Sequence, residues 1–167
     1  MKTLYMKADS GDVADYVIFS GDPGRVRNVC RYLEGVREIS RNREFCTFTG
    51  EYKGVPVTVT STGIGAPSAA IAMEEMYECG MKAAVRLGTV MGLLDNLGSY
   101  IIPRAAMRME ATSATYVDRG YPAVADFELL SCMNDSAADM KLDYCNDIIC
   151  SMDGYYSQMK ESRLSRK

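Results

Sequence analysis

The sequence contains no histidine among its 167 residues. Histidine is the usual general base near neutral pH and the commonest metal ligand, so serine–histidine and cysteine–histidine catalysis are excluded, even in a homo-oligomer. The six cysteines include no CxxC pair, which argues against a zinc ribbon or a thioredoxin-like redox motif. Most of the cysteines stand among apolar residues, and we expect them to be buried thiols. We therefore expect no bound metal.

Long apolar runs and a strong excess of one charge are also absent. No stretch approaches the length of a membrane span, and the first twelve residues lack the apolar segment of a signal peptide. A net charge of −3 and a pI of about 5.1 do not favour nucleic acid or anionic membranes. We expect a cytoplasmic protein without nucleic-acid or membrane partners. In such a protein, an anionic ligand must meet a local group of arginines.

The residues that are present predict one α/β domain over 1–167, with a central mixed β-sheet flanked by helices. The length suits a single domain, and 47% hydrophobic residues suit a soluble globular chain. Buried and alternating patterns predict strands at 15–20, 82–89, 99–107 and 144–152, and a hairpin at 45–61. Helical spacing predicts helices at 23–35, 68–80 and 122–140, the first two ending at glycines. Strands that alternate with helices favour this fold class.

Three predicted strands are followed by glycine-rich turns, SGDPGR, STGIGAPS and RLGTVMG, and ligands of open α/β sheets bind at such strand ends. In GDPGR, Asp22 is a plausible N-cap and Pro23 a plausible first helical residue. The helix start would then offer N–H groups to an anion, and Gly21 would let the backbone approach it closely. Arg25 could add a bidentate contact to phosphate. The alternative is an ordinary capped turn with Arg25 in solvent.

Arg86 lies inside an otherwise apolar strand, two residues before Gly88 and Thr89. A buried guanidinium without a partner is very costly, so Arg86 needs an anion or an open cleft. The anion could be a ligand phosphate, to which Thr89 could add a hydroxyl, or an internal carboxylate. Glu74, Glu75 and Asp126 are the candidates for that carboxylate. In the second case Thr89 is only a residue that favours strands.

Neither of the common nucleotide-binding loops fits these turns. The Walker pattern GxxxxGK[ST] is absent, and TGIGAPS lacks the third glycine of a dinucleotide fingerprint. Two strand-end arginines with glycine-rich backbone instead suit a small tetrahedral anion.

The motifs GDPGR, REF, STGIGAPSAAIAMEE, RLGT and YPAVADFE occur in the order and approximate spacing of the nucleoside phosphorylases. The sequence resembles the branch of purine nucleoside and uridine phosphorylases, and its uridine phosphorylase members most of all, from about residue 15 to 156. The resemblance implies reversible phosphorolysis of a nucleoside such as uridine, giving free base and ribose 1-phosphate. Inorganic phosphate would be a co-substrate, and no cofactor is implied.

The resemblance also implies roles for individual residues. Gly21, Arg25, Arg86 and Thr89 would bind phosphate, with the two arginines as the catalytic groups. Arg43, in NREF, would reach the phosphate of a neighbouring subunit, although alone it reads as an exposed hairpin arginine. A homo-oligomer is therefore implied, a dimer or a hexamer built as a trimer of dimers.

Departures from the family pattern fall on the sugar and base side. Met91 replaces a glycine in the turn GTVMG, where Met91 and Gly92 are expected beside base and sugar, and Tyr155 could stack on the base. The family's C-terminal part, which carries the ribose-gripping Glu-Met-Glu motif, is not matched within the 167 residues. The alternative hypothesis is therefore an inactive shortened relative that binds phosphate or nucleoside, or that assembles with a full-length paralogue.

Overall fold

The structure is a computed structural model that describes residues 2–93 and 97–159. Its contacts group into two compact units, Met1–Val90 and Met91–Lys167. The expectation of one domain over the whole chain stays a prediction. The first unit contains β1 (Tyr16–Ser20), α1 (Pro23–Cys30), β2 (Glu34–Asn42), β3 (Phe45–Tyr52), β4 (Val55–Ser61), α2 (Ala66–Glu78) and β5 (Ala83–Leu87). The second contains β6 (Tyr100–Ile101), β7 (Ala105–Met109), a short 3₁₀ turn (Ser113–Thr115), β8 (Ala123–Val124), α3 (Phe127–Asp139), β9 (Tyr144–Cys145), β10 (Ile148–Met152) and α4 (Tyr155–Met159).

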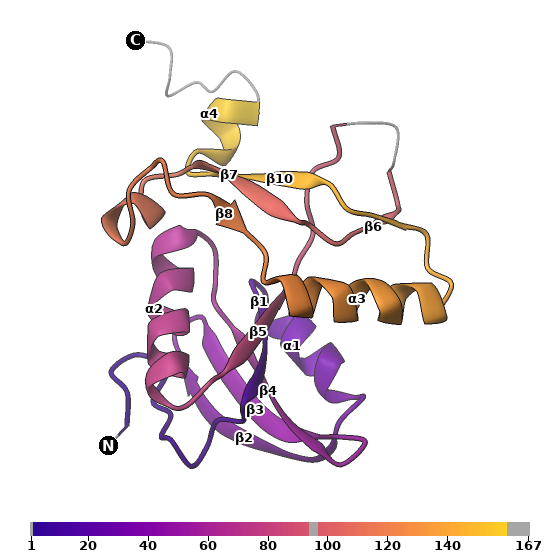
Figure 1. Ribbon diagram of the computed structural model, residues 1–167. Helices are drawn as coiled ribbons and strands as arrows, with labels where there is room; N and C mark the ends of the chain where they lie inside the picture. The colour runs from indigo at the N-terminus through magenta and orange to yellow at the C-terminus, as the bar shows by residue number, and fades with distance from the viewer. Residues whose placement is uncertain (1, 94–96, 160–167) are drawn as a thin grey trace. The chain divides into compact units, whose positions relative to one another are not determined.

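A five-stranded mixed sheet in the order β2-β3-β4-β1-β5 forms the first unit, with α1 and α2 beside it (Figure 1). β4, β1 and β5 run parallel, whereas β2, β3 and β4 form an antiparallel meander. The turn between β3 and β4 is Lys53-Gly54, and both residues have positive φ, as the tightest hairpin turns require. The predicted mixed sheet flanked by helices is confirmed.

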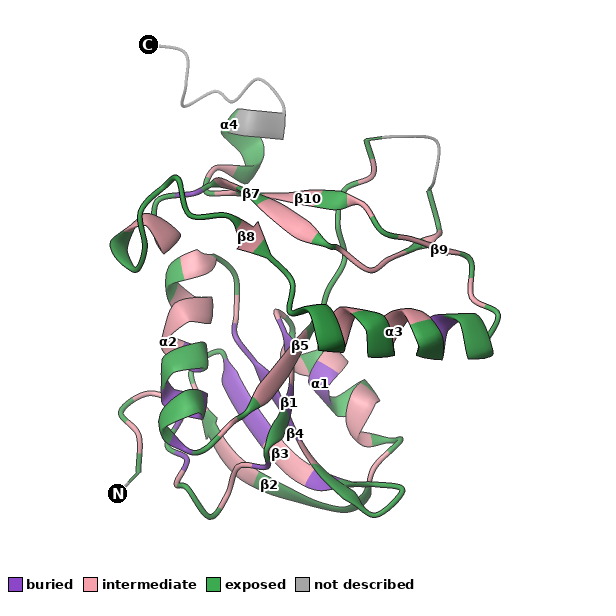
Figure 2. Ribbon diagram, in the orientation of Figure 1, coloured by how far each residue is buried: buried purple, intermediate pink, exposed green. Residues whose placement is uncertain are grey.

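The core of the first unit lies between the sheet and α2. Phe19 and Phe45 from the sheet pack with Met76 from α2 and with Met6 from the N-terminal segment, and all four are buried. Figure 2 shows buried residues along strands of this sheet and in short stretches of α1 and α2. This packing fixes the strands whose carboxyl ends carry the glycine-rich turns.

The helix predicted over 23–35 is shorter in the structure and ends at Cys30. The amides of Tyr32 and Leu33 donate to the carbonyls three residues earlier, which closes the helix with tight turns. Gly35 does not cap the helix but lies within β2, at a φ of 58° and beside a register shift. Pairing with β3 therefore overrides the helical spacing of this stretch.

Sequence patterns missed β2 altogether. Its residues, EGVREISRN, are mostly polar and exposed, because the strand lies at an edge of the sheet and shows no alternation of buried side chains. The predicted helix over 68–80 corresponds to α2, which begins two residues earlier, at Ala66.

The second unit has a three-stranded sheet, β10-β7-β8, and a two-stranded pair, β6-β9. The strand predicted over 99–107 is divided into β6 and β7, with Pro103, which has no N–H to donate, in the gap. The helix predicted over 122–140 begins only at Phe127, because Asp126 caps it by accepting from the amide of Leu129 at 2.9 Å. The last predicted strand is likewise split, into β9 and β10.

Arg108 organises the loop that follows β7. Its guanidinium donates to the Ser113 hydroxyl and to the carbonyls of Val117, Asp118 and Tyr121 at 2.8–3.1 Å. These four contacts give Arg108 a structural role in the second unit. Within residues 2–93 and 97–159, no helix is long and apolar enough to cross a membrane. The same residues contain no cluster of three or more metal-ligating side chains.

Candidate phosphate-binding site

Three strand ends meet at one edge of the first unit's sheet. Ser20 ends β1 and is in register with Ser61 of β4 and with Leu87 of β5, and the three strands are parallel. The glycine-rich turns that follow therefore begin side by side. They enclose an open pocket of about 710 Å³, lined by Gly21, Asp22, Pro23, Arg25, Glu44, Gly63, Ile64, Gly65, Arg86, Gly88 and Thr89. The sequence prediction of a site at these strand ends is consistent with this geometry.

The guanidinium of Arg86 lies against the backbone of two of these turns. A Cβ atom added to Gly88 would lie 2.6 Å from Nη1 of Arg86, closer than any ordinary contact. A Cβ added to Gly21 would lie 3.6 Å from Nη2 of the same side chain. Because neither glycine carries a side chain, the guanidinium can lie close to both turns in the lining of the pocket. Gly21 and Gly88 thus shape the position of Arg86 as well as the pocket wall.

The three carboxylates considered as partners of Arg86 do not pair with it. Glu75 is buried and accepts hydrogen bonds from the backbone amides of Tyr5 and Met6. Asp126 caps α3, and Glu74 is exposed on α2. Within the part of the chain that the structure describes, Arg86 makes no ion pair and is itself exposed. The open-cleft alternative therefore describes Arg86.

Asp22 caps α1 as the sequence predicts, and this changes the role of the helix start. Its carboxylate accepts from the amide of Gly24 at 2.8 Å, and its carbonyl accepts from the amide of Arg25 at 3.1 Å. Pro23 has no N–H. The first-turn amides are thus occupied by Asp22, and the expectation that they are open to an anion is wrong. The half-buried Arg25 side chain remains the first turn's group for an anion.

Two carboxylates line the pocket beside the two arginines. Asp22 is engaged by Gly24, and Oε1 of Glu44 accepts from the Ser68 hydroxyl at 3.0 Å. Glu44 packs tightly on Gly63, since a Cβ there would lie 2.6 Å from Cγ of Glu44. The formal charges of the lining side chains therefore balance within one chain. A dianionic ligand would need further positive charge from elsewhere.

Arg43 is the predicted phosphate ligand that does not line this pocket. It stands in the two-residue turn between β2 and β3, at a φ of 54°, and its side chain is exposed. Its guanidinium carbon lies 5.6 Å from the centre of the Tyr5 ring, within the range of a cation–π contact. Thr89, in contrast, lines the pocket, and its contact with phosphate stays a prediction.

The remaining predicted site residues belong to the second unit. Met91 and Gly92 begin it, and a Cβ on Gly92 would collide with the side chain of Leu97. Tyr155 opens α4, and its ring packs edge-on against Tyr156 with the ring centres 5.4 Å apart. Their expected contacts with base and sugar stay predictions.

None of the cysteines lines the pocket. Cys46 and Cys79 are buried, Cys30, Cys145 and Cys150 are half-buried and Cys132 is exposed, so the expectation that most are buried is wrong. Burial raises the pKa of the thiols of Cys30, Cys46 and Cys79, which keeps them protonated near neutral pH. The pocket of the first unit therefore offers charge and backbone for binding, and no thiolate nucleophile.

Sequence reasoning did not assign Glu44, Gly63, Ile64 or Gly65 to the phosphate site, although the family resemblance matches Glu44 and Ile64 to positions that hold a monovalent cation in some relatives. STGIGAPS is a glycine-rich turn by sequence, and its position after a buried strand is the signal that indicates the last three residues. Gly63 and Gly65 both have positive φ, and Ile64 between them is 97% exposed. Nothing in the local sequence indicates that Glu44 lies in the pocket, because pairing of β2 with β3 brings it there.

The family model of the phosphorylase superfamily matches residues 15–166. The chain belongs to this superfamily. Uridine phosphorylase from Thermococcus kodakarensis is 44% identical over 148 residues, which are 87% of this chain and 53% of that enzyme. Guanosine phosphorylase from Halorubrum lacusprofundi is 33% identical and is matched over 96% of this chain and 67% of its own length. The chain thus spans about half to two thirds of these relatives.

Solved structures agree with this assignment. Uridine phosphorylase from Vibrio fischeri superposes with a TM-score of 0.91 at 35% identity, over 95% of this chain and 69% of that one. Purine nucleoside phosphorylase from Toxoplasma gondii, in complex with immucillin-H, gives the same TM-score at 28% identity, over 99% and 67%. The α/β architecture of this chain is therefore that of the nucleoside phosphorylases.

Proposed function

We propose that this chain binds inorganic phosphate for the reversible phosphorolysis of a nucleoside, with uridine as the first substrate to test. One observation carries the proposal. Arg25 and Arg86, both without ion-pair partners in the described part of the chain, line a glycine-walled pocket where three parallel strands end. Relatives that share this fold are uridine, guanosine and purine nucleoside phosphorylases.

The chemistry needs what such a pocket supplies. A phosphate oxygen forms a bond to C1′ of the ribose while the bond from C1′ to the base nitrogen breaks, and its electron pair leaves with the base. The sugar carries positive charge in between, so a fixed phosphate beside it lowers the barrier through position and charge. Arg25 and Arg86 are the groups that would hold this phosphate, and Gly21 and Thr89 would complete its cradle. Neither histidine nor a metal ion is needed for these tasks.

The balanced charge of the pocket favours an oligomer in this proposal. Asp22 and Glu44 offset Arg25 and Arg86, so one chain alone offers a dianion little net attraction. Arg43 is exposed and lies outside its own pocket's lining, where a second copy could receive it. We therefore assign Arg43 to the phosphate of a neighbouring subunit, in a homodimer or a larger assembly of dimers.

Met91, Gly92 and Tyr155 are the groups proposed for the nucleoside. Met91 brings a long thioether to a turn where a glycine would leave more room, so it would narrow the space for base or sugar. The exposed ring of Tyr155 has a face available for stacking on a base. A pyrimidine would suit the narrower space.

Titration calorimetry with inorganic phosphate tests the binding step. Arg86→Ala should weaken binding by at least tenfold, because a charge-assisted contact is worth about 1.5–3 kcal/mol. Arg31→Ala is the matched control: it removes the same charge from an exposed residue at the end of α1, outside the pocket. Equal affinities of the wild type, Arg86→Ala and Arg31→Ala proteins would rule out the pocket as a phosphate site.

Release of uracil from uridine by the purified protein, dependent on phosphate, tests turnover. The alternative is a relative that binds phosphate or nucleoside without turnover, alone or with a full-length paralogue. This alternative is worth testing because all the lining residues of the pocket lie in the first unit, so phosphate could bind there without turnover. Phosphate binding that Arg86→Ala abolishes, together with no base release from any common nucleoside, would select this alternative.

A further inference from the structure

Tyr5 and Arg43 come from segments far apart in sequence, and their contact depends on an anchored N-terminal segment. The segment is Thr3–Ala8, which closes on itself through a hydrogen bond from the amide of Thr3 to the carbonyl of Ala8 at 2.9 Å. It carries Tyr5 to the turn between β2 and β3. Arg43 lies over the face of the Tyr5 ring, 5.6 Å from its centre.

The backbone of Tyr5 is held on both of its polar groups. Its amide donates to the buried carboxylate of Glu75, which also accepts from Met6 at 2.7 Å. Its carbonyl accepts from Nδ2 of Asn42 at 2.8 Å. The ring itself meets the buried Phe45 edge-on, with the centres 6.4 Å apart. The Tyr5 ring is therefore a fixed surface, and α2, β2 and β3 all contribute to fixing it.

The turn that carries Arg43 is held on both sides as well. Asn42 is bonded to Tyr5, and the carbonyl of Glu44 accepts from the Ser61 hydroxyl at 2.6 Å. Between these two anchored residues, Arg43 makes no hydrogen bond or ion pair in the described part of the chain, so its guanidinium keeps all of its donors. Contact with a ring face leaves a guanidinium's N–H groups open for an anion.

We propose that Tyr5 is a positioning residue for Arg43: its anchored ring holds the guanidinium in one orientation, ready for the phosphate of a neighbouring copy. This inference rests on the proposed function, because it treats Arg43 as a phosphate ligand. A long arginine side chain loses considerable freedom when it binds, and a ring that already restricts it lowers that cost. Tyr5 acts through Arg43 and touches no substrate.

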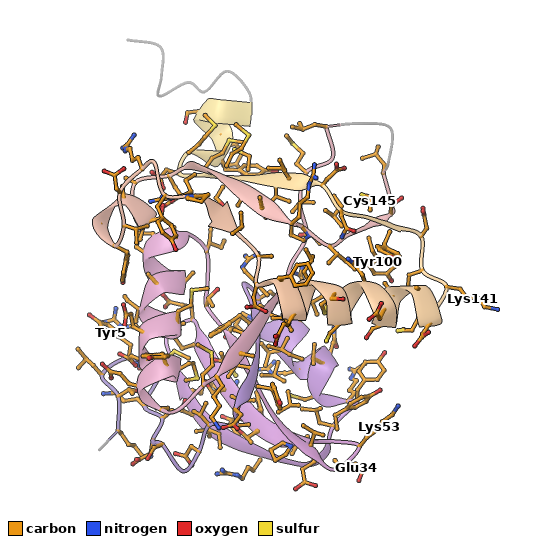
Figure 3. The ribbon with its side chains drawn as sticks, in the orientation of Figure 1. Tyr5, Glu34, Lys53, Tyr100, Lys141 and Cys145 are labelled. Carbon is orange, nitrogen blue, oxygen red and sulfur yellow. The ribbon has the colours of Figure 1, made fainter. Side chains whose placement is uncertain are left out.

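Phosphate titrations of four proteins test the inference: wild type, Tyr5→Leu, Tyr5→Phe and the control Tyr52→Leu. Tyr5→Leu removes the ring face and should weaken phosphate binding about two- to fivefold, as expected for an exposed cation–π contact. Tyr5→Phe keeps the face and should bind as the wild type does. Tyr52 is the last residue of β3 and lies outside the pocket, and Nζ of Lys53 in the hairpin turn lies 5.3 Å from the centre of its ring. Tyr52→Leu therefore removes the same kind of contact and should leave phosphate binding unchanged. Figure 3 shows Tyr5 and Lys53 on opposite sides of the first unit.

The decisive measurement is the coupling between the two residues. In an Arg43→Ala background, Tyr5→Leu should cause no further loss of phosphate affinity. An equal loss in both backgrounds would mean that Tyr5 acts elsewhere and would overturn the inference. If Tyr5→Leu fails to fold, Tyr5→Met replaces it, since Met has a similar apolar length and no ring face.

Phosphate titration distinguishes a failure of the proposed function from a failure of this inference. Wild-type protein that does not bind phosphate would overturn the proposed function and this inference together. Wild-type protein that binds phosphate, with Tyr5→Leu and Tyr5→Met unchanged in affinity, would overturn the inference alone. Loss in Tyr5→Phe equal to that in Tyr5→Leu would also overturn it, because the phenolic hydroxyl rather than the ring face would then matter.

Discussion

Replacing Gly88 by alanine should move the Arg86 guanidinium without removing it. The substitution therefore separates the effect of the guanidinium's position from the effect of its charge. The new Cβ would lie 2.6 Å from Nη1 and 3.5 Å from Cζ of Arg86, while ordinary contacts begin at about 3.4 Å. The backbone of Gly88 is not in the left-handed region, so alanine fits its conformation without strain. The atom in the way is the far end of a flexible side chain. The guanidinium therefore moves by close to an ångström, and the chain does not need to.

This geometry separates the effect on binding from the effect on stability. We expect the free energy of unfolding to change by less than about 0.5 kcal/mol, as for other exposed substitutions without a buried clash. Phosphate binding should weaken by about tenfold, because a displaced arginine loses most of a charge-assisted hydrogen bond worth about 1.5–3 kcal/mol. Arg86→Ala gives the upper limit of that loss.

Titration calorimetry and thermal unfolding of the same samples provide the assay. Gly11→Ala is the matched control, because its Cβ would meet nothing within 4 Å and its backbone also suits alanine. It should keep wild-type affinity and stability. If Gly88→Ala binds phosphate as tightly as Gly11→Ala does, the guanidinium is not placed by the glycine, and the reasoning from the 2.6 Å approach is refuted.

Three further predictions concern other parts of the chain. Gly63→Ala should lower the free energy of unfolding by about 1–2 kcal/mol in chemical denaturation, because Gly63 has a φ of 72° and its Cβ would press on Glu44; wild-type stability would contradict this. The hydrogen bond from the Ser113 hydroxyl, followed by that from the Ser113 amide, lowers the pKa of Glu110. This stabilisation is present above the unfolded pKa and is lost as pH falls through the folded pKa. The melting temperature of Ser113→Ala should therefore lie below that of the wild type at pH 7, and the gap should narrow below about pH 4 without closing, because the contact that Arg108 loses does not depend on pH; a constant gap would count against the prediction. Timed alkylation read by mass spectrometry should label the exposed Cys132 first and the buried Cys46 and Cys79 only on unfolding, and early labelling of Cys79 would show that its burial is wrong.

The sequence was most informative where local pattern and tertiary role coincide. β1, β3, β4 and β5 carry apolar or alternating residues, so these strands were predictable. β1, β4 and β5 also end in glycine-rich turns, so the position of the pocket at their ends was predictable as well. The N-cap role of Asp22 was predictable for the same reason, since capping needs only the local chain. The phosphate roles of Arg25 and Arg86 still rest on resemblance and charge.

The sequence was least informative where partners come from distant segments. β2 is polar, and only its pairing with β3 makes it a strand. The same pairing brings Glu44 into the pocket and Arg43 out of it, which no spacing along the chain indicates. Glu75 was considered as a partner for Arg86, but it binds the backbone of residues seventy positions earlier. Long-range contacts of this kind leave no periodic signal.

Charge balance and the position of Arg43 lead to the same conclusion from different observations. The pocket is lined by two arginines and two carboxylates, so their formal charges cancel and one pocket alone has little net attraction for a dianion. Outside that pocket, the exposed Arg43 lies over the Tyr5 ring. Tyr5 is held in turn by the segment's contacts with a buried carboxylate, with an asparagine and with the ring of Phe45. Such support is hard to account for if Arg43 only faces solvent, where a surface charge contributes little to stability. Both features are explained if the site is completed between two copies, with Arg43 supplying the positive charge that one pocket lacks.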